Sequence, residues 1–247
     1  MKWLVVLVVG AVLGASAMAV VRPGAEGDGE FGPEAVWKLG DEEIDKLFDC
    51  AGGADQAETR CALDVMDERG ASQDAQAFFQ HTHWFLQGFR ESGTVDLGEV
   101  VTPWRANSND DYLLLNGSPA VVFVEREAPP VAVFGQDPAY EPLRQAVNQT
   151  DDIPGEDDLV LWETDEFFED VEREGRKIRF VFQWSLKDAC HACSTGYLAR
   201  VALEFAPDGT YLGAVPLNIC WGGEGGEVER VEDGAPACPT PARSASR

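Results

Sequence analysis

The most informative segment for the fold is IRFVFQWSL, residues 178–186. Every second side chain in it is large and apolar, namely Ile178, Phe180, Phe182, Trp184 and Leu186. Successive side chains of a β-strand point to opposite faces of the sheet, so these five share one face. The pattern therefore predicts a strand with one face in the core and Arg179, Gln183 and Ser185 on the other.

A β-hairpin is predicted directly after this strand. Residues 197–205 and 211–219 are both rich in apolar side chains, and APDGT, residues 206–210, separates them. A Pro-Asp-Gly sequence favours a tight turn that ends in a left-handed glycine. Together with strand 178–186, the hairpin predicts a three-strand antiparallel meander.

The same turn predicts the register of the hairpin. If Ala206 lies opposite Thr210, then Phe205 lies opposite Tyr211 and Tyr197 lies opposite Ile219. Gly196 then faces Cys220. A slip by one residue would turn the charged side chains of the hairpin toward the core, so the register is well specified.

Residues 33–92 carry helical signals instead. Asp41 and Asp55 each begin a segment with apolar residues at helical spacing, and glycines follow both segments. Ser72 begins a longer segment in which Phe78, Phe85 and Phe89 share one face as far as Gly93. We therefore predict three helices in this region.

The middle of the chain is predicted to be mainly strand from Thr94 onward. Asn116-Gly117 indicates a two-residue hairpin turn. Residues 131–134 are predicted as a short edge strand, 142–147 as a short helix and 165–174 as an acidic helix.

The expected fold class follows from these segments. It is α+β: an N-terminal layer of three helices packs on a mainly antiparallel β-sheet, with a C-terminal three-strand meander and disulfide bonds for support. We expect a single domain over residues 33–221, helical over 33–92 and mainly β over 94–221. A flexible acidic and glycine-rich lead-in, 20–32, precedes it, and an irregular tail, 222–247, follows.

The first nineteen residues predict export. Met1-Lys2 supplies a positive charge, residues 3–13 are almost wholly apolar, and Ala17 and Ala19 provide cleavage sites with small residues. This order is typical of a secretory signal peptide. The apolar run is also shorter than the ~20 residues that a membrane-spanning helix needs. We expect a secreted or periplasmic protein with no membrane span in the mature chain.

The composition is strongly acidic. There are 44 Asp and Glu against 19 Lys and Arg, a formal net charge of −25. Such a charge repels nucleic acids and anionic membrane surfaces, so neither is an expected partner. The acidity is explained either by solubility or by binding of cations or basic partners.

All six cysteines follow the predicted signal peptide. An even number of cysteines in an oxidising compartment predicts disulfides. Cys50 and Cys61 are close in sequence and are expected to pair within the helical region. For Cys190, Cys193, Cys220 and Cys238 the pairing stays open, with Cys190 and Cys193 bonded to each other or one of them to Cys220. Their spacing is not that of a zinc site, so no metal is expected.

Three functions are compatible with these features. The favoured one is a non-catalytic binding or structural module of the cell envelope or exterior, without a cofactor, whose partner is an unknown protein or small molecule. An alternative is a thiol–disulfide protein that uses Cys190 and Cys193, although the motif lies between predicted strands and not at a helix N-terminus. The third is a small-ligand carrier or enzyme with a pocket lined by His81, Trp184 and Tyr197.

A peptide map of the non-reduced mature protein tests this framework. We expect the chain to begin at Val20 or at Met18, after cleavage behind Ala19 or Ala17, and Cys50 and Cys61 to lie in one linked peptide pair. A mature chain that keeps residues 1–19, or that carries six free thiols, would contradict the predicted export.

Overall fold

The structure is a computed structural model that describes residues 30–50, 55–104, 110–150, 159–188, 193–223 and 235–240. Three helices come first: α1 (Asp41–Phe48), α2 (Asp55–Glu68) and α3 (Gln73–Thr82). Two four-stranded sheets follow, with helix α4 (Tyr140–Thr150) between them. The predicted α+β class is confirmed.

Both sheets are antiparallel meanders. The first consists of β1 (Phe85–Arg90), β2 (Asp96–Val101), β3 (Asp110–Leu115) and β4 (Val121–Phe123). The second consists of β5 (Leu159–Glu174), β6 (Lys177–Asp188), β7 (Ser194–Phe205) and β8 (Tyr211–Trp221). A helix precedes each meander, α3 the first and α4 the second, so one succession of elements occurs twice.

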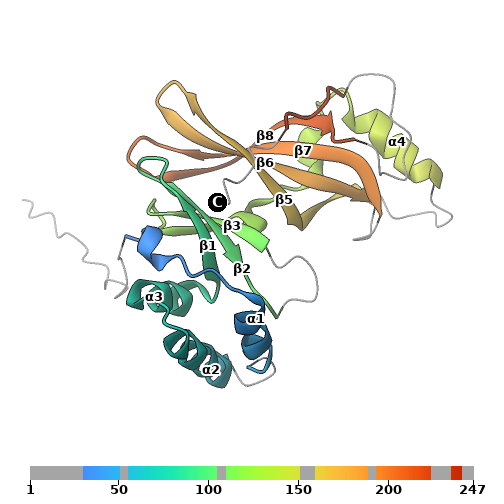
Figure 1. Cartoon of the computed structure of the whole chain (residues 1–247). Coiled ribbons are helices and arrows are strands. Elements are labelled where there is room, and N and C mark those ends of the chain that lie inside the picture. The colour runs from blue at the N-terminus through green and yellow to red at the C-terminus, as the bar shows by residue number, and fades with distance from the viewer. Residues whose placement is uncertain are drawn as a thin grey trace, which may run out of the picture.

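The first sheet lies between the three helices and the second sheet (Figure 1). On its helix side, Leu86, Leu113 and Leu115 pack with Phe78 of α3. On its other side, Leu97 and Leu114 join the core of the second sheet. The strand region therefore forms two packed sheets where a single sheet was expected.

Strand β6 confirms the alternating pattern of residues 178–186. Its five large apolar side chains are all at most 3% exposed and belong to one core cluster. Phe182 is at the centre of an aromatic group, with ring centroids 5.6 Å from both Tyr112 and Phe168 and 5.7 Å from Trp184. The same cluster includes Leu143 and Val147 of α4.

The predicted third helix ends much earlier than Gly93. It stops at Thr82, and His83 then adopts a left-handed conformation with φ of 62°. Residues 85–90 form β1 instead. The helical prediction failed because Phe85 and Leu86 are both buried, Phe85 with residues of all three helices and Leu86 with Phe78 of α3 and the leucines of β3. A strand buried on both faces loses the alternation that distinguishes it from a helix.

Three further local predictions are wrong. Residues 165–174 belong to the long strand β5, whose pairing with β6 outweighs the helical preference of its acidic residues. Residues 131–134 form the 3-10 helix η3 (Val131–Phe134) instead of an edge strand. Leu115 pairs with Val121, so the connection after β3 spans residues 116–120 and is not a two-residue turn.

The β7–β8 hairpin is present, and its register is correct only next to the turn. Phe205 pairs with Tyr211 as predicted, but Tyr197 pairs with Trp221, and Cys220 pairs with Leu198 and not with Gly196. Two irregularities each place one extra residue in β8, next to Phe205 and next to Arg200. Such β-bulges shift the register without an alternation signal in the sequence.

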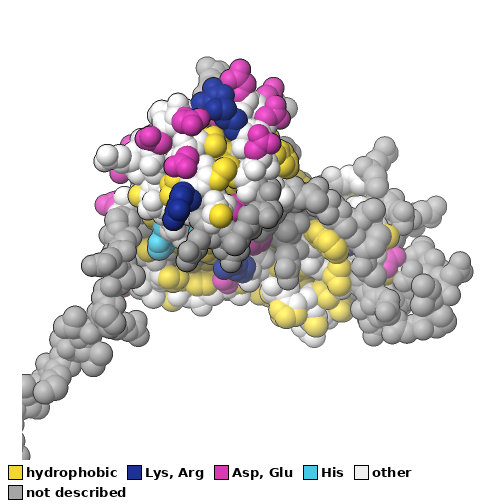
Figure 2. All heavy atoms as spheres, turned by 90° about the horizontal axis from the view of Figure 1, so that it is seen from below, with side chains coloured by type: hydrophobic (Ala, Val, Ile, Leu, Met, Phe, Trp, Pro, Cys, Tyr) yellow, Lys and Arg dark blue, Asp and Glu magenta, His cyan; other side chains and the backbone are white. Residues whose placement is uncertain are grey.

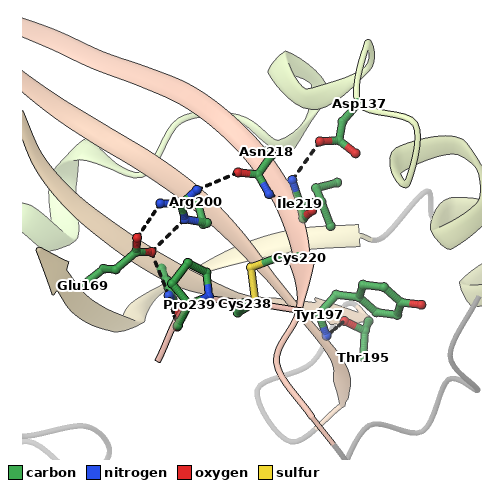
Figure 3. The surroundings of a disulfide bond; sticks show 11 residues. Asp137, Glu169, Thr195, Tyr197, Arg200, Asn218, Ile219, Cys220, Cys238 and Pro239 are labelled. Atoms are coloured by element: carbon green, nitrogen blue, oxygen red, sulfur yellow. Dashed lines mark hydrogen bonds and ion pairs between the residues drawn. A yellow bond between two sulfur atoms is a disulfide. The ribbon is translucent and has the colours of Figure 1, made fainter. Parts of the chain in front are cut away.

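Two disulfides link the described residues. Cys50 pairs with Cys61, as predicted, and joins the end of α1 to α2. Cys220 pairs with Cys238 and holds the C-terminal residues 235–240 against β8 (Figure 3). There the Trp221 amide donates to the Pro236 carbonyl at 2.7 Å. The Cys220–Cys238 bond excludes the expected alternative in which Cys220 takes Cys190 or Cys193.

Within the described ranges, no helix is both long and apolar enough to cross a bilayer.

A matched pair of phenylalanines tests the core. Phe182→Ala is expected to lower the free energy of unfolding by about 3–5 kcal/mol, because it empties a fully buried position. Phe167→Ala, on the neighbouring strand and 46% exposed, is the control and should change it by no more than about 0.5 kcal/mol. Denaturant titration measures both, and similar losses in the two variants would contradict this description of the core.

Candidate functional site

The candidate site begins with the first described residues. We call residues 30–34 the N-terminal strap. Its Phe31 amide donates to Asn116 Oδ1 at 2.8 Å, and Asn116 Nδ2 donates to the Phe31 carbonyl at 2.8 Å. The Phe31 ring packs edge-on against Phe78, with centroids 5.0 Å apart. Residues 30–32 therefore belong to the fold, although the sequence placed them in a lead-in too polar to pack.

A second contact holds the other end of the strap. Ser72 caps the N-terminus of α3, where its hydroxyl oxygen accepts the Ala75 amide hydrogen bond. The same hydroxyl donates to the Glu34 carbonyl at 2.6 Å. The strap is thus fixed to the β3–β4 connection at Phe31 and to the helical layer at Glu34.

An open pocket of about 600 Å³ lies between the strap and the β1–β2 turn. Its walls come from two chain segments that are about sixty positions apart in the sequence. The strap contributes one wall and the end of β1 with the following turn contributes the other, and the lining residues are Glu30, Phe31, Gly32, Pro33, Glu34, Phe89, Glu91, Gly93 and Asp96. This volume is within the range of small-molecule sites.

Asp96 is the most firmly positioned carboxylate of the pocket. It begins β2, is 6% exposed, and accepts hydrogen bonds from the Ser92 amide at 2.8 Å and from Asn116 Nδ2 at 2.7 Å. Asn116 thus contacts both walls, through Phe31 on the strap and through Asp96 on the turn. Its φ of 64° places it in the left-handed region, which Asn tolerates better than most residues.

The pocket is acidic on both walls. Glu30 and Glu34 lie on the strap, and Glu91 and Asp96 lie on the β1–β2 side. Among the described residues that line it, none is Lys or Arg. The Arg173 guanidinium approaches the rim near Gly93. Carboxylates grouped around one recess produce a negative potential that attracts cations.

A glycine makes room for one of these carboxylates. A Cβ at Gly32 would lie 2.5 Å from Glu34 Oε1 and 2.7 Å from Glu34 Oε2. The Glu34 side chain therefore folds back over the Gly32 backbone, and it would have to move if residue 32 carried a side chain. The wider surface is also acidic: Figure 2, seen from the side of the helical layer, shows Asp and Glu side chains spread over that face.

The residues predicted to line a pocket lie elsewhere. Trp184 and Tyr197 are 0% and 1% exposed and belong to the core of the second sheet. His81 is exposed on α3, where its ring centroid is 5.8 Å from that of Phe31, a lining residue of the observed pocket. The structure therefore does not bring these three side chains together, and only His81 is near the pocket.

The Cys-x-x-Cys motif lies in the connection between β6 and β7. Cys190 falls outside the described residues, and Cys193 is disulfide-bonded. Its carbonyl accepts the Asp188 amide at 2.9 Å, and β7 begins at the next residue. In thiol oxidoreductases, the N-terminus of a helix lowers the pKa of the reactive cysteine. Cys193 is followed by a strand, so the redox alternative gains no support from its surroundings.

A buried acid pair joins the two sheets. Asp111 of β3 and Glu166 of β5 are 4% and 7% exposed. Burial, together with the neighbouring Glu166 carboxyl, raises the pKa of Asp111 to about 10. Two carboxylates can share a hydrogen bond only when one of them is protonated, so the pair retains a proton at neutral pH. Neither Asp111 nor Glu166 is a lining residue of the pocket.

Among the described residues, no three His, Cys, Asp or Glu side chains form a group that could hold a metal ion.

The acid pair predicts a pH dependence of stability. The pKa of Asp111 is raised from 3.8 to about 10, so the native state holds a proton that the unfolded chain releases in this window. Its stabilising contribution is therefore present at low pH and is lost as pH rises toward 10. Asp111→Asn should flatten this decline by at most about 1.4 kcal/mol per pH unit.

Denaturant titration at several pH values measures the effect. The control is Asp110→Asn, which removes the exposed carboxylate next in the chain and should keep the wild-type slope. Equal slopes in wild type and Asp111→Asn would show that Asp111 is ionised in the native state.

Known proteins provide no template for this site. Comparison of the chain with protein-family models, with curated proteins and with solved structures found no match. The function is therefore inferred from the chemistry of the chain's own residues, and the acidic pocket between the strap and the β1–β2 turn is the strongest candidate site.

Proposed function

We propose that this protein is a non-catalytic binding module of the cell exterior or periplasm, and that it binds a positively charged organic ligand in the acidic pocket. The observation that carries the proposal is the pocket itself. Four carboxylates line a recess of about 600 Å³, two on each wall. A recess of this size accepts a small organic molecule or a side chain of a larger partner.

The chemistry of the lining favours a cation with an apolar part. Phe31, Pro33 and Phe89 supply apolar surface between the carboxylates. Aromatic rings attract cations through their negative faces, and apolar surface favours the carbon chain of an amine. An amine or guanidinium group with a short hydrocarbon chain therefore fits this lining better than a neutral sugar or an anion.

The placement outside the cytoplasm is supported by the covalent framework. Cys50–Cys61 and Cys220–Cys238 are both formed, and such bonds persist in oxidising compartments. The signal-peptide pattern of residues 1–19 points to the same destination. The proposed ligand would accordingly be an extracellular or periplasmic amine, or a basic segment of a protein in the same compartment.

Charge-neutralising variants test the proposed function. Wild type should bind the linear tetraamine spermine at one saturable site at low ionic strength, measured by isothermal titration calorimetry. Glu34→Gln/Glu91→Gln removes one charge from each wall and should weaken this binding about tenfold, since each lost ionic contact contributes roughly 0.7 kcal/mol.

The control is Asp45→Asn/Asp67→Asn, which removes two exposed carboxylates from α1 and α2. It changes the net charge by the same amount, two units less negative, and should leave spermine affinity within about twofold of wild type. An equal loss in both double variants would assign the binding to overall charge and not to the pocket.

A further inference from the structure

We infer that the N-terminal strap is a ligand-coupled wall of the pocket, held by Asn116, and that the ligand is an extended cation that bridges the two acidic walls. This inference rests on the proposed function and deepens it. It specifies the spacing of positive charge in the ligand and the conformational consequence of binding.

The two ends of the strap are held by different contacts, and only the outer end depends on Asn116. Glu34 is fixed by Ser72, and the following Ala35 is 1% exposed in the core under α3. Phe31 is fixed by its two backbone hydrogen bonds to the Asn116 side chain and by its ring contact with Phe78. The Asn116 amide therefore carries the polar attachment of the outer end of the strap.

Negatively charged side chains lie on both walls of the pocket. When the strap is docked, Glu30 and Glu34 face the wall that contains Glu91 and Asp96. Like charges grouped around one open recess repel one another, so docking has an electrostatic cost. The Asn116 hydrogen bonds to Phe31 and Asp96 oppose that cost, because they tie one wall directly to the other.

The ligand that suits two acidic walls is one that contacts both of them. A cation that contacts both walls at once neutralises the repulsion and is bound completely only when the strap is docked. A ligand that favours one of two states shifts the population toward that state, and the coupling is reciprocal. An extended cation with separated positive groups can reach both walls of a recess of about 600 Å³, whereas a single small ion contacts one side at a time.

The variant that tests the coupling is Asn116→Asp. It preserves the size of the side chain and the acceptor for the Phe31 amide. It removes the Nδ2 donor shared by the Phe31 carbonyl and Asp96, and it places a carboxylate beside the Asp96 carboxylate. Ser118→Asp is the matched control, because it adds the same charge to the same connection at an exposed position that does not contact the strap.

Two readouts are needed on the full mature protein. Hydrogen exchange measured by mass spectrometry follows the peptide that contains residues 31–39, and calorimetry follows binding of spermine, with propylamine and Ca²⁺ as compact cations. We expect spermine to slow exchange in this peptide of the wild type. Propylamine and Ca²⁺ at equal ionic strength should have little effect, because neither bridges the walls.

Asn116→Asp is expected to speed exchange in residues 31–39 and to weaken spermine binding, each about tenfold. Ser118→Asp should match wild type in both. Unchanged exchange in peptides from β6 and β7 shows that the Asn116→Asp variant is folded, and Asn116→Ser, which keeps a small polar side chain without added charge, replaces it if that exchange changes.

The outcomes separate the two proposals. If spermine fails to bind wild type, the proposed function is wrong and the inference is wrong with it. If spermine binds but leaves exchange in residues 31–39 unchanged, or if Asn116→Asp binds as tightly as wild type, the pocket stands and the coupling is wrong. If propylamine slows exchange as strongly as spermine, the bridging ligand is wrong.

Discussion

One face of β6 is buried in a core that it shares with the first sheet and with helix α4, and this packing holds the fold together. The same row of side chains, from Ile178 to Leu186, joins a cluster that includes Leu114 of the first sheet and Leu143 of α4. One strand therefore connects the two halves of the fold. Each large side chain buried there contributes ~1.5–3 kcal/mol to the free energy of folding. Because the two meanders share this core, neither can bury its apolar face alone.

The edges of the sheets explain why the pocket forms where it does. On β8, the outward amides of Tyr211 and Ile219 donate to the Ser118 carbonyl and to Asp137, and Pro216 lacks an amide hydrogen. On the edge strand β1, the Leu86 carbonyl accepts the Trp37 amide at 2.9 Å. Covered edges resist pairing with other chains. The N-terminal segment that covers β1 continues into the strap, and the pocket opens where the strap leaves the sheet.

Local signals in the sequence were sufficient for part of the fold. The alternation in β6, the Pro-Asp-Gly turn after Phe205 and the close spacing of Cys50 and Cys61 each involve neighbouring residues, and all three predictions are confirmed. The predictions for residues 85–90 and 165–174 failed although both segments pair with the strand that directly follows them in the sequence. Their local composition also suits a helix, and pairing with a neighbouring strand outweighed it.

The acidic charge, the α+β class, the core strand and the local disulfide could all be predicted from the sequence, because each depends on composition or on residues close together in the chain. The candidate site, in contrast, depends on tertiary packing. Phe31 and Asn116 are 85 positions apart, and one side-chain amide joins the strap to the turn that holds Asp96. The spacing of apolar residues in the sequence does not predict such a contact. It depends on how separate elements pack and on the left-handed backbone conformation of Asn116.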